Sequence, residues 1–248
     1  MANHILFVFE GERAEKQISD NLTQYFINKN TIVQSVYGAE IYQLYRQISE
    51  DNDLDTFALL KEREQNKLSL SKYDRKDFAQ IYLFFDYDGH SSLADDERLK
   101  DALTLFNEET EFGKLFISYP MVEALKHYSE AIDFKELKVK AKEKIAYKKL
   151  VSEASKKEFS QLTSYTKGIW IELIEIHLKK MNHIVNAEYV LPIENISQIE
   201  IFLKQLEKYI KIDSTVAVLS AFPVFLIDYY GIIYISELIS DKNYQNSL

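Results

Sequence analysis

The sequence predicts an α/β domain with a mostly parallel sheet flanked by helices, followed by a largely helical C-terminal half. Two short apolar runs, 4–9 and 81–85, are unbroken by charged residues and rich in β-forming residues. Such runs are typical of strands that are buried on both faces of a parallel sheet. Between and after these runs, apolar residues recur at helical spacing, so that strands and helices alternate as in layered α/β domains.

The elements follow one another in order along the first 128 residues. After the first strand, Ile18, Leu22, Tyr25 and Phe26 mark one face of a helix, and the β-branched run 31–37 predicts a second strand. Helical patterns at 41–48 and 54–60, a polar loop at 69–76, and the strand 81–85 come next. A helix over 99–106 and a strand over 114–117 complete this part, and Pro120 is placed to start a further helix.

The pattern changes after about residue 130. Residues 133–184 read as almost wholly helical, a second helical face covers 199–210, 215–219 is strand-like, and Pro223 is placed to start a last helix through Tyr230. We therefore expect an α/β domain over 1–130 and a mainly helical region over 131–248. This region is either a second domain or an insertion whose segment 215–220 rejoins the sheet.

Composition narrows the class of protein. The 248 residues contain no cysteine, which excludes disulfides and thiolate metal sites and fits a reducing cytoplasm. No signal peptide is evident, and the longest apolar stretch, 216–227, is too short to span a bilayer and contains Pro223. We expect a cytoplasmic protein with no membrane partner.

Both long apolar runs end in acidic residues. Glu10 follows the first run, and Asp86 and Asp88 follow the second. Open α/β sheets bind ligands beyond the carboxyl ends of their strands, so neighbouring strands would bring these three carboxylates together. Carboxylates that converge repel one another unless a cation lies between them, and a hard divalent ion such as Mg²⁺ or Mn²⁺ suits oxygen ligands. The alternative is that both motifs are ordinary turns with exposed acids.

These motifs resemble the Toprim domain of primases, topoisomerases and OLD-type nucleases. The order is Glu10-Gly11 after the first strand, Asp86-x-Asp88 after a later one, and then Ser118-x-Pro120-x-x-Glu123. Its local form is similar to the RloB-like and AbiL-type Toprim proteins of phage-defence loci, and it covers residues 4–128. Many Toprim proteins have an aspartate where Ala14 stands, and the sequence leaves open whether Glu15 replaces it. His127 lies near the histidine that the relatives carry, but in a different register.

The resemblance implies a Mg²⁺-dependent nuclease that acts as a toxic effector in anti-phage defence by abortive infection. Glu10, Asp86 and Asp88 would be the catalytic residues, and Glu123 would be a further metal ligand. Glu10 would serve as a ligand or as the general acid or base. Nucleic acid, either DNA or RNA, would be the substrate, and a defence-system ATPase would be a partner.

A basic segment is the second candidate for contact with substrate. Nine lysines and three glutamates lie between Lys135 and Lys157, in a chain whose net charge is −9. Lys138, Lys142 and Lys149 are candidate phosphate contacts, although such runs are more often solvated helix faces. Near the acidic motifs, Arg13 and His90 are further candidates for holding substrate.

Two other functions compete with the nuclease. Asp86-x-Asp88-Gly89 also resembles the motif of haloacid-dehalogenase-type phosphatases, in which the first aspartate is a covalent nucleophile. That motif usually follows the first strand of the chain, whereas here a strand with its own acid precedes it. The other alternative is a non-catalytic metal-binding or partner-binding module, because a fold does not fix a function.

Overall fold

The computed structural model describes residues 3–11, 13–29, 31–37, 40–51, 54–87, 95–141, 143 and 145–245. The chain divides into two compact units. Unit 1 comprises Met1–Phe85 and Leu93–Phe116, and unit 2 comprises Asp86–Ser92 and Ile117–Leu248. Each unit is described separately.

A mostly parallel sheet of five strands organises the N-terminal part, which confirms the predicted α/β class. The strand order is β2-β1-β3-β5-β4, and β1 pairs in parallel with both β2 and β3. The central strands are buried on both faces, as their continuous apolar sequences predict. The strands are β1 (Asn3–Phe9), β2 (Thr31–Tyr37), β3 (Phe78–Asp86), β4 (Asn107–Glu108) and β5 (Gly113–Ser118).

Aromatic side chains on one side of the sheet form the densest part of the core of unit 1. Phe84 lies at the centre, with its ring 5.5 Å from that of Phe9 and 5.8 Å from that of Phe116, both in stacked orientations. Phe7 contacts Phe84 edge-on at 5.3 Å. Such pairs add to the free energy of burial and fix the register of neighbouring strands.

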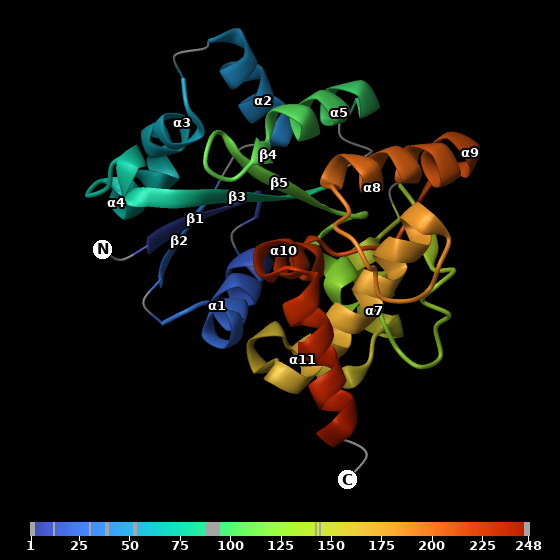
Figure 1. Cartoon of the computed structure of the whole chain (residues 1–248). Coiled ribbons are helices and arrows are strands. Elements are labelled where there is room, and N and C mark those ends of the chain that lie inside the picture. The colour runs from blue at the N-terminus through green and yellow to red at the C-terminus, as the bar shows by residue number, and fades with distance from the viewer. Residues whose placement is uncertain are drawn as a thin grey trace. The chain divides into compact units, whose positions relative to one another are not determined.

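Helices cover both faces of this sheet (Figure 1). α1 lies on one face, and α2 and α5 lie together on the other (Figure 1). α1 buries Ile18, Leu22 and Phe26, the face that the sequence pattern predicts. The helices of unit 1 are α1 (Ala14–Phe26), α2 (Ile41–Glu50), α3 (Thr56–Glu62), α4 (Lys67–Leu70) and α5 (Asp96–Leu105), with short 3₁₀ turns at Glu64–Asn66 and Arg75–Asp77.

Unit 2 is mainly helical around α7 (Lys167–Asn186), whose buried face includes Trp170, Ile174 and His177. α8 (Gln198–Gln205), α10 (Ala221–Tyr230) and α11 (Ile232–Gln245) pack against it. The shorter elements are η3 (Val122–Lys126), α6 (Tyr147–Ala154), the 3₁₀ turns Lys157–Phe159 and Leu162–Ser164, a π-helical turn Leu206–Ile210, and α9 (Lys211–Asp213).

A small antiparallel sheet lies within unit 2, where β6 (Lys138–Lys140) pairs with β7 (Thr215–Ala217). The expected continuous helix over 133–184 is therefore wrong in its first part. Val139 is buried between the exposed Lys138 and Lys140, and this alternation of period two suits a strand better than a helix. The strand-like segment 215–219 provides β7, and Leu219 also forms an isolated bridge with Tyr119.

Two predicted helix starts need adjustment. Pro120 follows a cis peptide bond, and the helix after it is the short 3₁₀ helix η3, which begins at Val122. α10 does contain Pro223 in its first turn and ends at Tyr230, but α11 follows it. Gly231 joins the two helices with a φ of 82°, which a residue with a side chain rarely adopts.

No single helix among the described residues is long and apolar enough to cross a membrane. Only α10 and α11 taken together reach the required length and hydropathy, and they are bent by 111°.

Candidate active site

The predicted carboxylates of the first two motifs follow β1 and β3. Glu10 directly follows β1 in unit 1 and is half-buried. Asp86 is the last residue of β3, is also half-buried, and belongs to unit 2. Asp88 and His90 lie outside the described residues. β1 and β3 are parallel neighbours, with Phe9 opposite Phe84.

Gly11 of the Glu10-Gly11 motif packs closely beside Glu15 in the first turn of α1. A Cβ atom at Gly11 would lie 2.6 Å from Oε1 and 2.8 Å from Oε2 of Glu15, so the carboxylate of Glu15 occupies the space that a side chain would need. Glu15 is buried, whereas Arg13 is exposed. A side chain at position 11 would displace the carboxylate of Glu15, which provides a second acid beside the end of β1.

Glu123 is the most unusual acid of unit 2. It lies in the first turn of η3 and is only 9% exposed. Its Oε1 lies 3.5 Å from Nζ of Lys148, but its Oε2 is buried without a hydrogen-bond partner among the described residues. A buried carboxylate oxygen without a partner is costly, so it indicates a missing cation or hydrogen-bond donor.

The buried Tyr147 is affected by the charges of both Glu123 and Asp86. Burial raises the pKa of the Tyr147 hydroxyl well above its usual value of 10.0, and the negative charges of Glu123 and Asp86 raise it further. Both carboxylates therefore act on the same hydroxyl group. Tyr147 stays protonated at neutral pH, and its oxygen shares a hydrogen bond of 2.9 Å with Nδ1 of His127. Burial lowers the pKa of His127 to about 4, so this histidine is neutral.

A second buried histidine, His177, forms a hydrogen bond with η3. The backbone N–H of Ser220 donates to Nδ1 of His177 at 3.2 Å. Because that nitrogen is an acceptor, Nε2 carries the proton and donates to the carbonyl of Leu125 at 3.2 Å. His177 is completely buried, and burial lowers its pKa to about 3. The neutral imidazole thus ties η3, which carries Glu123, to the start of α10.

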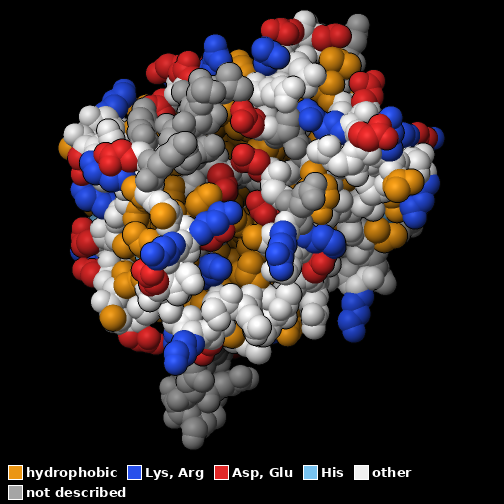
Figure 2. Space-filling view, turned by 180° about the vertical axis from the view of Figure 1, so that it is seen from behind, with side chains coloured by type: hydrophobic (Ala, Val, Ile, Leu, Met, Phe, Trp, Pro, Cys, Tyr) orange, Lys and Arg blue, Asp and Glu red, His pale blue; other side chains and the backbone are white. Residues whose placement is uncertain are grey.

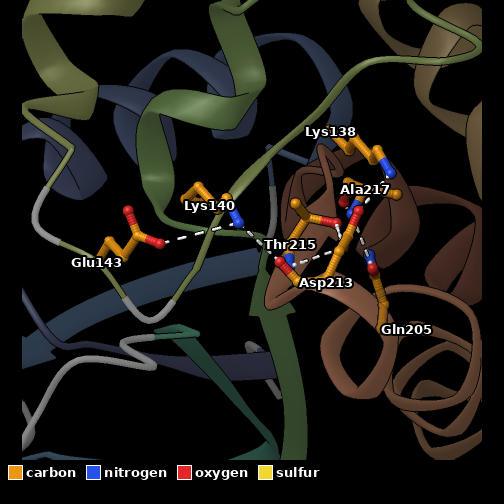
Figure 3. A network of polar contacts seen from close by, with 7 residues as sticks. All are labelled: Lys138, Lys140, Glu143, Gln205, Asp213, Thr215 and Ala217. Carbon is orange, nitrogen blue, oxygen red and sulfur yellow. Dashed lines mark hydrogen bonds and ion pairs between the residues drawn. The ribbon is translucent and has the colours of Figure 1, made fainter.

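The lysines predicted to contact phosphate differ in their surroundings. Nζ of Lys138 donates to Asp213 at 2.6 Å, while Lys140 donates to the backbone carbonyl of Asp213 at 2.9 Å (Figure 3). Asp213 in turn accepts a hydrogen bond from the backbone N–H of Thr215 at 3.2 Å. Lys138 thus belongs to a network that holds β6 beside β7.

Lys149 is less constrained than Lys138. It is 77% exposed in its side chain and lies 3.9 Å from Glu153, whereas Lys142 is outside the described residues. On the face shown in Figure 2, Lys and Arg side chains are interspersed with Asp and Glu side chains. Exposed pairs of this kind contribute only about 0–1 kcal/mol each.

The donor set around Tyr147 suits a hard cation. Asp86 and Glu123 offer carboxylate oxygens, and one oxygen of Glu123 lacks a partner among the described residues. Mg²⁺ is commonly held by one or two carboxylates and completes its octahedron with water or phosphate oxygens. Within the described part of the chain, no group of three or more potential ligands is close enough to form a full protein site. Asp86 and Glu123 each supply carboxylate oxygens of the kind that Mg²⁺ prefers, and the described residues alone do not complete a site around them.

Sequence reasoning did not find Tyr147 and Lys148, and it left the role of His127 open. Nothing in the local sequence marks Tyr147, which is one of 17 tyrosines. Lys148 belongs to the lysine-rich segment, but only the fold places it beside Glu123.

The chain was compared with protein-family models, curated proteins and solved structures, and none of them matches it.

Proposed function

We propose that this protein is a Mg²⁺-dependent nuclease of the Toprim type, which cleaves phosphodiester bonds of nucleic acid as a toxic effector in anti-phage defence. The observation that carries this proposal is the buried carboxylate of Glu123, which lies in the same unit as Asp86; the negative charges of both acids raise the pKa of Tyr147. These two acids come from separate motifs, 37 positions apart in the sequence, and one of them has a buried carboxylate oxygen with no partner among the described residues.

The strand order gives further support. β1 and β3 are parallel neighbours, and each is followed or ended by an acid of the motifs, Glu10 and Asp86. Parallel strands present their carboxyl ends at one edge of a sheet, which is where α/β enzymes bind their ligands. The exposed Arg13 directly precedes α1, the helix that follows Glu10, and would contact substrate.

Each of these residues would have a separate role in the reaction. Asp86, Asp88 and Glu123 would hold Mg²⁺, which stabilises negative charge on a phosphodiester when bound. Glu10 would supply or accept a proton at the reacting oxygen, since its place after a rigid central strand fixes its position. The neutral Tyr147–His127 pair carries no charge that would compete with the cation.

The test is cleavage of labelled DNA and RNA oligonucleotides by the purified chain, with Mg²⁺, with Mn²⁺ and with a chelator. We expect cleavage that requires the metal. Glu10→Gln should abolish it while changing the affinity for nucleic acid by less than about tenfold, about 1.4 kcal/mol. Cleavage by this variant at the wild-type rate would remove Glu10 from the reaction.

The same preparations distinguish the alternatives. Metal-dependent hydrolysis of p-nitrophenyl phosphate without cleavage of oligonucleotides would favour a phosphatase in which Asp86 is the nucleophile. Mg²⁺ binding without either activity would favour a metal-binding or partner-binding module, for example one that acts with a defence-system ATPase.

A further inference from the structure

The first turn of α6 is electrostatically unusual. Lys148 and Lys149 lie in this turn, no acidic residue does, and the residue before the helix, Ala146, provides no side-chain cap. The N-terminus of a helix carries a partial positive charge, so lysines there are unfavourable. Helices usually begin with a serine, threonine or acidic residue instead. Lys149 lies 3.9 Å from Glu153 of the same helix, whereas the ion-pair partner of Lys148, Glu123, lies outside α6.

A rigid contact fixes this turn beside η3. Tyr147, the first residue of α6, is buried and shares a hydrogen bond with the buried His127, which directly follows η3. The two rings meet edge-on at 5.3 Å. The backbone N–H groups at the start of α6 are thus held in place by residues that are themselves buried.

The carboxylate of Glu123, next to Lys148, supports a ligand-binding site at this turn. Lys148 is 72% exposed in its side chain, and its Nζ lies 3.5 Å from Oε1 of Glu123. The other carboxylate oxygen of Glu123 is buried and has no partner within the described ranges. One ammonium group on one side therefore leaves Glu123 incompletely satisfied, which is costly in a buried position.

Cationic and anionic groups that lie side by side suit a ligand that carries both charges. Carboxylates alone would repel a phosphate, and lysines alone would repel a metal ion. A phosphate with its own Mg²⁺ satisfies both sides, because the ion meets the carboxylates while the phosphate oxygens meet the ammonium group and the helix N-terminus. Surface lysines without an adjacent buried carboxylate would bind phosphate only as scattered charges.

We propose that the first turn of α6, with Lys148 as the ligand side chain, is a binding site for a phosphate group whose Mg²⁺ ion is held by Glu123. This site rests on the proposed function, in which it would hold a backbone phosphate of the nucleic-acid substrate. Tyr147 is a positioning residue, which acts through the placement of the helix N-terminus.

The test uses inorganic phosphate in the presence of Mg²⁺, with binding to the full chain measured by isothermal titration calorimetry. Lys148→Gln should weaken binding about tenfold, as expected for the loss of a charge-assisted hydrogen bond, and Lys148→Arg should restore most of it. Lys204→Gln is the matched control, since Lys204 lies in the same unit and forms a surface pair with Glu207 at 2.7 Å. It should bind phosphate as the wild type does.

Two further results separate this site from the proposed function. If the wild type binds phosphate through Lys148 but cleaves no nucleic acid, the site stands and the nuclease proposal fails. If the wild type cleaves and Lys148→Gln retains its KM and its salt dependence of binding, the nuclease stands and the site is overturned. Equal phosphate affinity in the wild type and in Lys148→Gln also overturns the site.

Discussion

His177 should make the protein sensitive to acid well above the pH at which carboxylates titrate. Both ring nitrogens are engaged in the neutral form, Nδ1 as an acceptor from Ser220 and Nε2 as a donor to Leu125. Protonation would place a second proton on Nδ1, opposite a backbone N–H, and would create a completely buried charge. The folded state therefore resists protonation of His177 far more than the unfolded state does.

The size of the effect follows from the pKa values. The pKa of His177 is about 3 in the folded protein, against 6.5 for the model value. A group whose folded pKa is lowered contributes stability above the unfolded pKa and loses it as the pH falls. Between pH 7.5 and pH 5, the lowered pKa of His177 should reduce the free energy of unfolding of the protein by about 2 kcal/mol. His127, with a folded pKa of about 4, should reduce the free energy of unfolding by a similar amount.

The assay is urea unfolding at pH 7.5 and pH 5, followed by tryptophan fluorescence. Trp170 is the only tryptophan, is completely buried, and lies on α7, the same helix as His177, so its fluorescence reports on unit 2. His127 and His177 together should contribute about 4 kcal/mol to the loss of stability of the wild type at pH 5. His177→Gln should be less stable than the wild type at pH 7.5, but its loss on acidification should be smaller by about 2 kcal/mol.

The control is His4→Gln, the same substitution at a histidine of unit 1, whereas the fluorescence of Trp170 reports on unit 2. Two results would refute the reasoning. One is a wild type that is equally stable at both pH values. The other is a His177→Gln variant with the full wild-type loss, which would show that another group takes up the proton.

Three further outcomes are expected. Tyr147→Phe should lower the free energy of unfolding by about 1–3 kcal/mol in the same fluorescence assay, because it leaves Nδ1 of the buried His127 without its partner; an unchanged value would make that hydrogen bond unimportant. Asp88→Asn should abolish Mg²⁺ binding in calorimetry with the fold retained, and should raise the melting temperature of the metal-free protein, whereas wild-type affinity would exclude Asp88 as a ligand. Burial lowers the pKa of Lys180 to about 7, so between pH 7 and pH 10 the unfolded chain binds more protons than the folded protein, and the wild type should become more stable as the pH rises. Lys180→Met should flatten this rise. An equally steep rise in the variant would show that Lys180 does not cause it.

Part of the fold could be predicted because it depends on local patterns. The runs ending at Phe9 and Phe85 form buried strands, and the spacing of Ile18, Leu22 and Phe26 gives the buried face of α1. Hydrophobic periodicity reports which side of an element faces a core, whatever the rest of the chain does. The prediction was wrong over 138–140, where a run of lysines was taken as helical although its alternation around Val139 marks a strand.

The candidate site could be predicted only in part. The acidic motifs include Asp86 and Glu123, and in the structure the charges of both raise the pKa of the buried Tyr147. Nothing in the sequence indicated that Lys148 would pair with Glu123, which lies 25 positions earlier in the chain. The described residues between η3 and β6 form no helix or strand, and periodicity carries no information about where such a segment leads.

The sequence by itself determined four of the five strands of the central sheet, all but β4, and the acids at the ends of β1 and β3, because strand formation and strand ends depend on neighbouring residues. Only the tertiary structure decided which charges meet. Burial fixed His127 and His177 as neutral, left one oxygen of Glu123 without a partner among the described residues, and engaged Lys138 with Asp213. The physical reason is that desolvation and charge pairing depend on distances between residues far apart in the chain, which only the packed fold sets.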